Sequence, residues 1–455
     1  MPISQIVSLG IASRLFIWSL ATISSYLSDD YDSSASTLLT AKDSNNSISN
    51  QALQVSLRWD AFYFLHLAEE GYVYEQEHAF FPLFPILVRG IANFIKLFPL
   101  ISTIIVNYER TALLVIGVSL SNFFFVAAAV AIYNLSIAVF HDKKFALITA
   151  IFYILSPSCI FMSSLYTESL FAFLSFLGMQ YVVEKHYWRA AFVWAFASFT
   201  RSNGIVYVGF FVFDLILKKD DIISNLNGSI NIAKVFSARI LKSSILCVIS
   251  TIGFVVFEIY GYMSYCLENK ATTTMMTNPH RRPWCKSRIP LLYTFVQTYY
   301  WNCGFLSYYQ VKQIPNFLFA TPMILLSFFG IFVYAEYDWK RFISLGWRRN
   351  EASNKTDIHN KGTKEQETST YFSSMLLPFI YLWMVLLVYA LTSMHIQVIT
   401  RFFSSQPTVY WFASYMLIES KRNDVSRKWA KLILNYFVIY GLCGVILFAN
   451  FFPPA

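Results

Sequence analysis

The sequence predicts an all-α polytopic membrane protein, and three features lead to this fold class. Of the 455 residues, 56% are hydrophobic and 13% are charged, whereas an ordinary soluble domain has about 25% charged residues. Aromatic residues make up a further signal, at 18% of the chain. The apolar residues also gather into long runs between short polar segments, as expected for helices that cross ~30 Å of hydrocarbon.

The positive charge of the chain follows the same pattern. The net charge of +9 is carried by short basic runs between apolar segments, which is typical of loops retained on the cytoplasmic side. No basic face with interleaved aromatics lies outside the membrane, so nucleic acid is not expected as a partner. Membrane lipids are the expected partners. The basic runs are Lys143-Lys144, Lys218-Lys219, Lys340-Arg341, Arg348-Arg349, Lys421-Arg422 and Arg427-Lys428.

Apolar runs of suitable length predict about eleven transmembrane helices. They cover approximately residues 3–27, 109–140, 145–163, 168–183, 189–200, 204–217, 240–263, 315–336, 372–394, 402–418 and 432–450.

The first of these helices has no small-residue cleavage site, so we expect a retained anchor and not a cleaved signal peptide. Arg14 lies inside it. A charge at that depth is costly, so Arg14 is expected to pair with an acid or a phosphate among other helices, or to extend its side chain to the interface.

Two of the predicted helices, 189–200 and 204–217, are shorter than a full crossing requires. They are separated by Arg201-Ser202-Asn203-Gly204. Non-helical backbone within a membrane is tolerated where it lines a cavity, so we expect a broken pair whose turn points into a polar site.

The first loop, residues 28–108, contains two kinds of sequence. Its start is rich in Ser, Asn and Asp and carries a glycosylation sequon at Asn45. From residue 57, apolar and polar positions alternate, and Pro82 and Pro85 interrupt the more apolar part from 80 to 100. We expect amphipathic helices that lie in the interface. If 80–100 crossed the membrane instead, every later orientation would invert.

Two later loops differ in composition. Residues 338–367 are a basic, low-complexity cytoplasmic insertion, expected to be a linker, with a sequon at Asn354. Residues 268–313 are rich in Trp, Tyr, Pro and Cys, which suits a folded lumenal cap. Three cysteines, Cys266, Cys285 and Cys303, fall in or near this cap, so one disulfide is possible there, with a pairing that the sequence leaves open.

The expected organisation follows from these features. It comprises a first transmembrane helix (1–27), a lumenal loop with interfacial helices and an Asp motif (28–108), transmembrane helices with a break near 201–204 (109–263), a lumenal aromatic loop (264–314), a transmembrane helix (315–336), a cytoplasmic loop (337–371) and C-terminal transmembrane helices (372–455).

This topology gathers a set of polar residues at one membrane face. No phosphate-binding loop, dinucleotide fingerprint or nucleophile elbow is present, and the seven His lack metal-ligand spacing. No cofactor and no divalent metal are therefore indicated. The gathered residues are Trp59, Asp60, His66, Tyr166, Glu168, Arg201, Asn203, Gln313, His395, Gln397 and Arg401.

A carboxylate among several cations suits the transfer of a sugar from a lipid phosphate. Asp60 would act as general base toward the acceptor hydroxyl, and a single base without a carboxylate nucleophile favours inversion. Arg201, Arg401 and His395 would bind the donor phosphate. The residues expected to bind substrate are Trp59, His66, Tyr166, Glu168, Asn203, Gln313 and Gln397.

Several of these residues have a structural alternative. Asp60 could cap the helix that follows it. Glu168 could pair with Arg201, Trp59 could belong to a headgroup belt, and Arg401 and His395 could anchor the interface. Glu258, alone in an apolar helix, is expected to make a structural pair.

Several motifs in the chain resemble the GPI mannosyltransferase 2 (PIG-V-like) family. They are Trp59-Asp60-Ala61, Ala79-Phe80-Phe81-Pro82, Ser156-Pro157-Ser158 with 160–163, Tyr166-Thr167-Glu168-Ser169-Leu170-Phe171, Thr200-Arg201-Ser202-Asn203-Gly204, Gln313-Ile314-Pro315-Asn316-Phe317 and residues 395–402. The resemblance implies a GT-C-type glycosyltransferase in the endoplasmic reticulum membrane, with a lumenal site and Asp60 as base. It also implies dolichyl-phosphate-mannose as donor, mannosyl-glucosaminyl-phosphatidylinositol as acceptor and an α-1,6 product. Fungal members of the family work with a small membrane partner subunit.

Other function classes stay open from the sequence. A polytopic transporter would also need buried charges and a broken helix, although no half-chain symmetry is evident. A non-catalytic subunit of a membrane assembly is a second alternative. Another dolichyl-phosphate-sugar-dependent GT-C transferase, acting on a different acceptor, is the nearest alternative among enzymes.

Overall fold

A computed structural model describes residues 2–28, 30–31, 51–98, 109–217, 232–267, 282–347, 371–421 and 424–452. Within these ranges every regular element is a helix, which agrees with the predicted all-α class. The sequons at Asn45, Asn227 and Asn354 lie outside the described residues, as does most of the 338–367 insertion.

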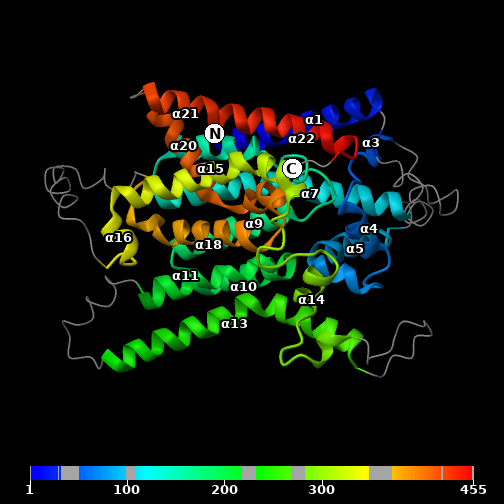
Figure 1. Cartoon of the computed structure of the whole chain (residues 1–455), viewed down its shortest axis with the longest axis horizontal. Coiled ribbons are helices and arrows are strands. Elements are labelled where there is room, and N and C mark those ends of the chain that lie inside the picture. The colour runs from blue at the N-terminus through cyan, green and yellow to red at the C-terminus, as the bar shows by residue number, and fades with distance from the viewer. Residues whose placement is uncertain are drawn as a thin grey trace.

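Long apolar helices run side by side, roughly along the longest axis of the molecule (Figure 1). Among the described residues, six such stretches are long and apolar enough to cross a membrane, so the chain is a multi-pass membrane protein. They contain α1 (Pro2–Leu27), α7 (Glu109–Phe140), α13 (Ile232–Tyr265), α15 (Ile314–Tyr337), α18 (Leu377–Ser393), and the run of α21 (Asp424–Asn435), η10 (Tyr436–Tyr440) and α22 (Gly441–Ala449).

The other five predicted crossings correspond to shorter helices, so the count of eleven is not confirmed. None of them reaches the ~20 residues that a full crossing requires. Their bounds are α8 (Lys143–Ile154), α9 (Glu168–Val183), α10 (Tyr187–Thr200), the run of η2 (Ser202–Tyr207), α11 (Val208–Val212) and η3 (Phe213–Leu217), and α20 (Pro407–Glu419).

The helix predicted over 145–163 ends early, at Ile154. Pro157 explains the difference, because it cannot donate a backbone hydrogen bond and it disfavours helical geometry at Ser156. Residues 155–167 instead form consecutive turns that are almost wholly buried. Buried non-helical backbone needs other hydrogen-bond partners, and side chains of neighbouring helices supply them. Asn122 donates to the Ser163 carbonyl at 2.9 Å, and Ser121 donates to the Tyr166 carbonyl at 3.2 Å.

Arg14 donates hydrogen bonds to the same buried segment, residues 155–167. This corrects the prediction that Arg14 pairs with an acid or a phosphate. Its guanidinium donates to the carbonyl of Cys159 at 2.8 Å and to Ser163 Oγ at 2.9 Å. It also stacks on the ring of Phe125, 3.6 Å from the ring centroid. The side chain is 5% exposed, so it does not extend to an interface. Its N–H groups donate to backbone carbonyls that have no hydrogen-bond partner within a helix.

The short helices of the first loop and of the aromatic loop lie at one end of the bundle. This end holds α4 (Ala61–Glu69), α5 (Leu83–Ile95) and α14 (Leu292–Tyr299), and α16 (Trp339–Ile343) lies at the other end (Figure 1). With 13 residues, α5 is about 20 Å long and is too short to cross a bilayer.

Glu75 joins the first loop to the aromatic loop. It lies in η1 (Glu75–Ala79) and accepts hydrogen bonds from Trp284 Nε1 at 2.7 Å and from Tyr300 OH at 3.1 Å. Arg282 forms an ion pair with the same carboxylate at 3.3 Å. The disulfide that the sequence allowed joins Cys266 to Cys285, and Cys303 is a free thiol.

His78 is enclosed by aromatic rings at the same junction. Its ring stacks nearly parallel to Phe257, with centroids 5.2 Å apart, and lies 4.5 Å from the ring centroid of Tyr72. The side chain is 1% exposed. Burial disfavours the charged imidazolium and lowers the pKa of His78 from its usual 6.5 to about 4.

This pKa predicts that the protein loses stability on acidification. Between pH 6.5 and 4 the unfolded chain binds a proton at His78 that the folded chain does not, so stability falls as pH falls, by about 3 kcal/mol at most. We expect His78→Phe to flatten the pH dependence of the melting temperature, measured in detergent. The exposed His141, changed to Asn, is the matched control and should keep the slope. An unchanged slope in His78→Phe would contradict the assignment.

Candidate functional site

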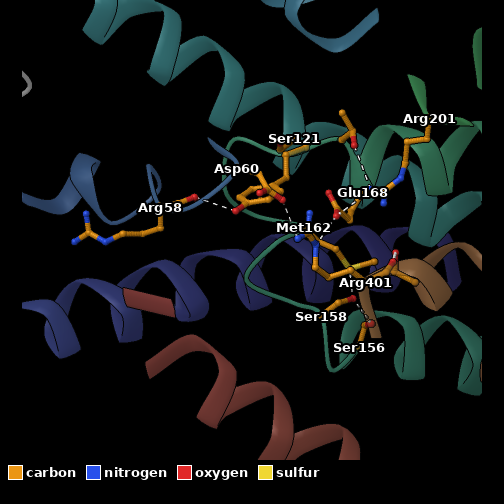
Figure 2. Close-up of polar contacts among 12 residues, drawn as sticks. Arg58, Asp60, Ser121, Ser156, Ser158, Met162, Glu168, Arg201 and Arg401 are labelled. Carbon is orange, nitrogen blue, oxygen red and sulfur yellow. Dashed lines mark hydrogen bonds and ion pairs between the residues drawn. The ribbon is translucent and has the colours of Figure 1, made fainter. Parts of the chain in front are cut away.

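Arg401 lies at the centre of a charged cluster built from four separate segments (Figure 2). It belongs to α19 (Ile399–Phe402). Its Nη1 donates to Asp60 Oδ2 at 3.0 Å, and its Nε donates to Glu168 Oε1 at 2.8 Å. Arg401 therefore joins two carboxylates that are 108 positions apart in the sequence. This joining brings the first loop, the start of α9 and the segment before α20 together.

The backbone that presents Asp60 is held by Arg58. Its guanidinium donates to the carbonyls of Ala449 at 3.2 Å and Gln54 at 3.0 Å, and stacks on the ring of Phe451. The side chain is 2% exposed. Arg58 thus fixes the chain immediately before the Trp59-Asp60 dipeptide to the C-terminal helix.

Trp59 adopts a left-handed backbone conformation, with φ +53°. Such a conformation costs a bulky L-residue roughly 1–2 kcal/mol and persists where the surrounding structure imposes it. The Trp59 side chain is 41% exposed. Asp60 follows at the N-cap of α4 without a capping side-chain bond, so the capping alternative for this carboxylate is not found.

Tyr166 also holds the backbone at Arg58. It is fully buried, and its hydroxyl donates to the Arg58 carbonyl at 2.9 Å. The Arg401 guanidinium lies over its ring, 4.9 Å from the centroid, and over the ring of Phe161 at 4.5 Å. Substrate binding by Tyr166 stays a prediction; in the structure its hydroxyl donates to the Arg58 carbonyl and Arg401 lies over its ring. Its contacts hold Asp60 and Arg401 in register.

Glu168 receives both arginines at one oxygen. It begins α9 and is 1% exposed, a position at which the helix dipole favours an anion. Arg201 Nη1 lies 2.9 Å from the same Oε1 that Arg401 Nε contacts. The structural pair between Glu168 and Arg201 that the sequence allowed is therefore present.

Arg201 stands at the break between α10 and η2. Its backbone is extended, with φ −154° and ψ 145°, where the sequence predicted a turn. The turn fits closely against α10, because a Cβ added to Gly204 would lie 2.6 Å from the Ser198 backbone nitrogen. The Arg201 side chain is 24% exposed, and Asn203 lies partly buried at the same turn.

The charges of the cluster balance, but its exposure is uneven. Two carboxylates face two guanidiniums, and burial alone would disfavour the Arg401 charge, yet Glu168 and Asp60 raise the pKa of Arg401 above its usual range. Glu168 is covered, whereas 29% of the Asp60 side chain and 24% of the Arg201 side chain are exposed. Within the described residues, Asp60 Oδ1 has no hydrogen-bond partner. The cluster therefore offers one unpaired carboxylate oxygen and one partly exposed guanidinium, whose Nη1 also donates to Thr167 Oγ1 at 3.3 Å.

A second polar network joins three other predicted residues. Tyr308 OH donates to Gln397 Oε1 at 3.2 Å, and Asn316 Nδ2 donates to Tyr308 OH at 2.8 Å and to Gln313 Oε1 at 2.6 Å. His395 stacks on Tyr308 with centroids 4.7 Å apart. Gln397 lies in η8 (Ile396–Val398), which directly precedes α19. The network is therefore next to Arg401 in the sequence.

His395 differs from the cation that the sequence suggested. Burial lowers the pKa of its imidazole below the usual 6.5, and a backbone hydrogen bond with Trp301 raises it by less. The lowered pKa disfavours the charged form, and the neutral imidazole can donate or accept a hydrogen bond.

His66 lies apart from the Arg401 cluster. It is on α4, where its Nδ1 contacts Glu77 Oε1 at 2.6 Å and its Nε2 contacts Glu70 Oε2 at 3.5 Å. Glu77 Oε2 accepts the backbone N–H groups of Val73 and Tyr74. His66 thus orders the loop after α4. In the described part of the chain, no three His, Cys, Asp or Glu side chains gather as metal ligands.

Sequence patterns did not identify three residues that shape the site. Arg58 adjoins the Trp59-Asp60 motif, so its position was a usable signal. Tyr63 is three residues after Asp60 and therefore shares its face of α4, where its ring stacks on Phe80 with centroids 4.6 Å apart. Tyr293 reaches Ser202 from the aromatic loop, and no local pattern marks it.

Known proteins resemble this chain over most of its length. A family model described as Mannosyltransferase (PIG-V) matches residues 3–455. Human GPI alpha-1,6-mannosyltransferase 2 is 31% identical over 446 residues, which cover 87% of this chain and 86% of the human protein. GPI mannosyltransferase 2 of Gibberella zeae is 30% identical over 467 residues, which cover 100% and 98% of the two chains.

A solved structure also aligns with this chain. The Archaeoglobus fulgidus oligosaccharyltransferase superposes with a TM-score of 0.43 and 10% identity, covering 96% of this chain. The alignment spans about half of the archaeal chain, 53%.

The charged cluster predicts a strong effect of removing its buried carboxylate. Glu168→Gln leaves Arg401 and Arg201 without a shared anion, and breaking a buried pair in this way costs about 3 kcal/mol or more. We expect a clearly lower melting temperature in detergent. Asp424 is the matched control, because its side chain is 83% exposed in a pair with Arg427, and Asp424→Asn should leave the melting temperature nearly unchanged. Equal effects of the two substitutions would contradict a structural role for Glu168.

Proposed function

This chain belongs to the PIG-V mannosyltransferase family, and from that membership and the geometry of its charged site we propose that it adds the second mannose to the glycosylphosphatidylinositol precursor. It is a GPI mannosyltransferase. The finer proposal is an α-1,6 linkage, formed by a GT-C-type transferase with dolichyl-phosphate-mannose as donor and mannosyl-glucosaminyl-phosphatidylinositol as acceptor. The human relative is named as an alpha-1,6-mannosyltransferase, which supports the linkage.

The observation that carries the mechanism is the half-open carboxylate of Asp60. Arg401 holds Oδ2 at 3.0 Å, while Oδ1 has no partner within the described residues and 29% of the side chain is exposed. A general base needs this combination of fixed orientation and one free oxygen within reach of the proton that it removes. Asp60 is therefore our candidate for the base.

The proposed reaction is a single displacement. Asp60 Oδ1 takes the proton of the acceptor hydroxyl while that oxygen forms a bond to the anomeric carbon of mannose. The bond between the anomeric carbon and the phosphate oxygen breaks, and its electron pair leaves with dolichyl phosphate. Attack from the face opposite the phosphate inverts the configuration, because no second carboxylate acts as nucleophile.

Arg201 is the proposed contact for the donor phosphate. One of its nitrogens is held by Glu168, and a quarter of the side chain is exposed at the turn. A guanidinium fixed in this way can stabilise the charge that develops on the leaving phosphate. Arg401, with its two carboxylate partners, would act mainly by orienting Asp60. His395 is a further proposed contact for the donor phosphate, through a hydrogen bond from its imidazole.

Several further residues are proposed substrate contacts. Trp59 is exposed next to the base and can stack on a sugar face. Gln313 and Gln397, in the network around Tyr308, offer amide groups for sugar hydroxyls. Asn203 does so at the Arg201 turn. Neither a cofactor nor a divalent metal is part of this proposal.

Enzyme activity removes two of the alternatives that the sequence left open, the transporter and the non-catalytic subunit. A related transferase that acts on a different acceptor is the remaining competitor. The names of the human and Gibberella zeae relatives favour the GPI precursor. A small membrane partner subunit stays a prediction.

The proposed base predicts the result of a single substitution. Asp60→Asn keeps the shape of the side chain and a hydrogen bond with Arg401 but removes the proton acceptor. We expect the transfer rate to fall by about 10²–10⁴-fold, measured with purified protein, lipid-linked mannose and the GPI precursor. Expression and melting temperature should stay close to those of the parent. Full transfer activity in Asp60→Asn would exclude Asp60 as the base.

The proposed location in the endoplasmic reticulum membrane places Asp60 on the lumenal side. Val73 lies in the same loop and is 49% exposed. In a background that lacks the free thiols of Cys303 and Cys443, a Val73→Cys variant in sealed microsomes should react with a membrane-impermeant maleimide after permeabilisation but not before. Labelling of intact vesicles would place the site on the cytosolic face.

A further inference from the structure

Glu258 lies in α13, within one of the stretches apolar enough to cross a membrane, and is 8% exposed. A buried carboxylate is costly unless hydrogen bonds satisfy it. Both of its oxygens face the backbone nitrogen of Tyr293, at 3.2 Å for Oε1 and 3.4 Å for Oε2. Tyr293 is in the first turn of α14, where the backbone N–H groups of a helix lack internal partners. Glu258 therefore caps α14 from a different element.

The capped helix contacts the Arg201 turn directly. Ser202 Oγ donates to Tyr293 OH at 2.8 Å, and Ser202 is the residue after Arg201. This hydrogen bond crosses from the aromatic loop to the break between α10 and η2. A movement of α14 would therefore move the backbone that carries Arg201.

Two other contacts keep α14 and the Arg201 turn at a fixed separation. The α13 helix packs so closely on α10 that a Cβ added to Gly253 would lie 2.4 Å from the Ala195 carbonyl oxygen. At the far end of α13, the Cys266–Cys285 disulfide ties the aromatic loop to the helix. In Figure 1, α14 lies beside the end of α13.

We infer that Tyr293 and Glu258 are positioning residues for donor binding: they dock α14 on the 201–204 turn and so hold the Arg201 guanidinium toward the donor phosphate. This inference rests on the proposed contact between Arg201 and that phosphate. Neither residue touches the reacting atoms. The sequence alone suggested a structural pair for Glu258 and no role for Tyr293. The contact with Ser202 connects both to the site.

The test compares hydroxyl deletions at both ends of the hydrogen bond. Tyr293→Phe and Ser202→Ala should each raise the KM for dolichyl-phosphate-mannose about three- to tenfold, which corresponds to the loss of one hydrogen bond. The KM for the GPI precursor should stay unchanged. The double variant should be no worse than either single variant, because both remove the same bond. Tyr299→Phe is the matched control, since Tyr299 ends the same helix and is 70% exposed; it should leave the KM for both substrates unchanged.

Arg201→Ala, measured beside these variants, distinguishes the phosphate contact of Arg201 from the positioning role of Tyr293 and Glu258. It should raise the donor KM more than Tyr293→Phe does. If it does so while Tyr293→Phe and Ser202→Ala leave the donor KM unchanged, the positioning role is wrong and the phosphate contact stands. If Arg201→Ala leaves the donor KM unchanged, the phosphate contact is wrong and the positioning role is overturned with it.

Glu258 is tested by rescue. Glu258→Ala should raise the donor KM as Tyr293→Phe does, and Glu258→Gln should restore most of the parent value because its amide oxygen still accepts an N–H group. A donor KM that is equally raised in both variants, or unchanged in both, would overturn the capping role. Should Glu258→Ala fail to fold in a melting assay, Glu258→Asp takes its place, because its shorter side chain withdraws the carboxylate from the Tyr293 backbone nitrogen. It should also raise the donor KM, and an unchanged value would overturn the capping role.

Discussion

The geometry of the site depends on the double ion pair of Arg401. A single guanidinium spans Asp60 and Glu168 at 3.0 and 2.8 Å, and the planar arrangement of its nitrogens permits both contacts at once. Because desolvated charges are costly without partners, the covered Arg401 and Glu168 depend on each other, and Arg401 also orients the partly exposed Asp60. The first loop, the start of α9 and the segment before α20 are therefore fixed relative to one another by charge as well as by apolar packing.

Around this pair, the protein keeps irregular backbone inside a bundle of helices. The turns between α8 and α9 place Tyr166 and Glu168, and the break after α10 places Arg201. Such backbone would be unstable in a membrane without hydrogen-bond partners. Arg14, Asn122 and Ser121 supply them for the first segment. A charge in an apolar helix is thus used to satisfy carbonyls, and a catalytic role need not be assigned to every buried arginine.

The aromatic loop is also held in place by polar contacts and a disulfide. Its attachment through Glu75, through the disulfide and through the cap at Glu258 fixes its position at several points. Its aromatic composition suggested a folded cap. The rings around His78 come instead from the first loop, through Tyr72, and from α13, through Phe257. Within the described residues, this loop and α4 occupy the same end of the bundle, where Asp60 and Arg201 are both partly exposed.

The sequence by itself determined the helical membrane class, the break at Arg201 and the membership of Asp60, Arg201, Glu168 and Arg401 in one set, because hydrophobic length and charge placement are local properties that a bilayer makes decisive. It also contained the reason that the 145–163 helix is interrupted, in Pro157. The tertiary structure decided the rest. Contacts between residues far apart in the chain decide whether Arg14 faces an acid or a carbonyl, which cysteines pair and which helix Glu258 caps. Desolvation and hydrogen bonding act at those contacts, and no local pattern records them.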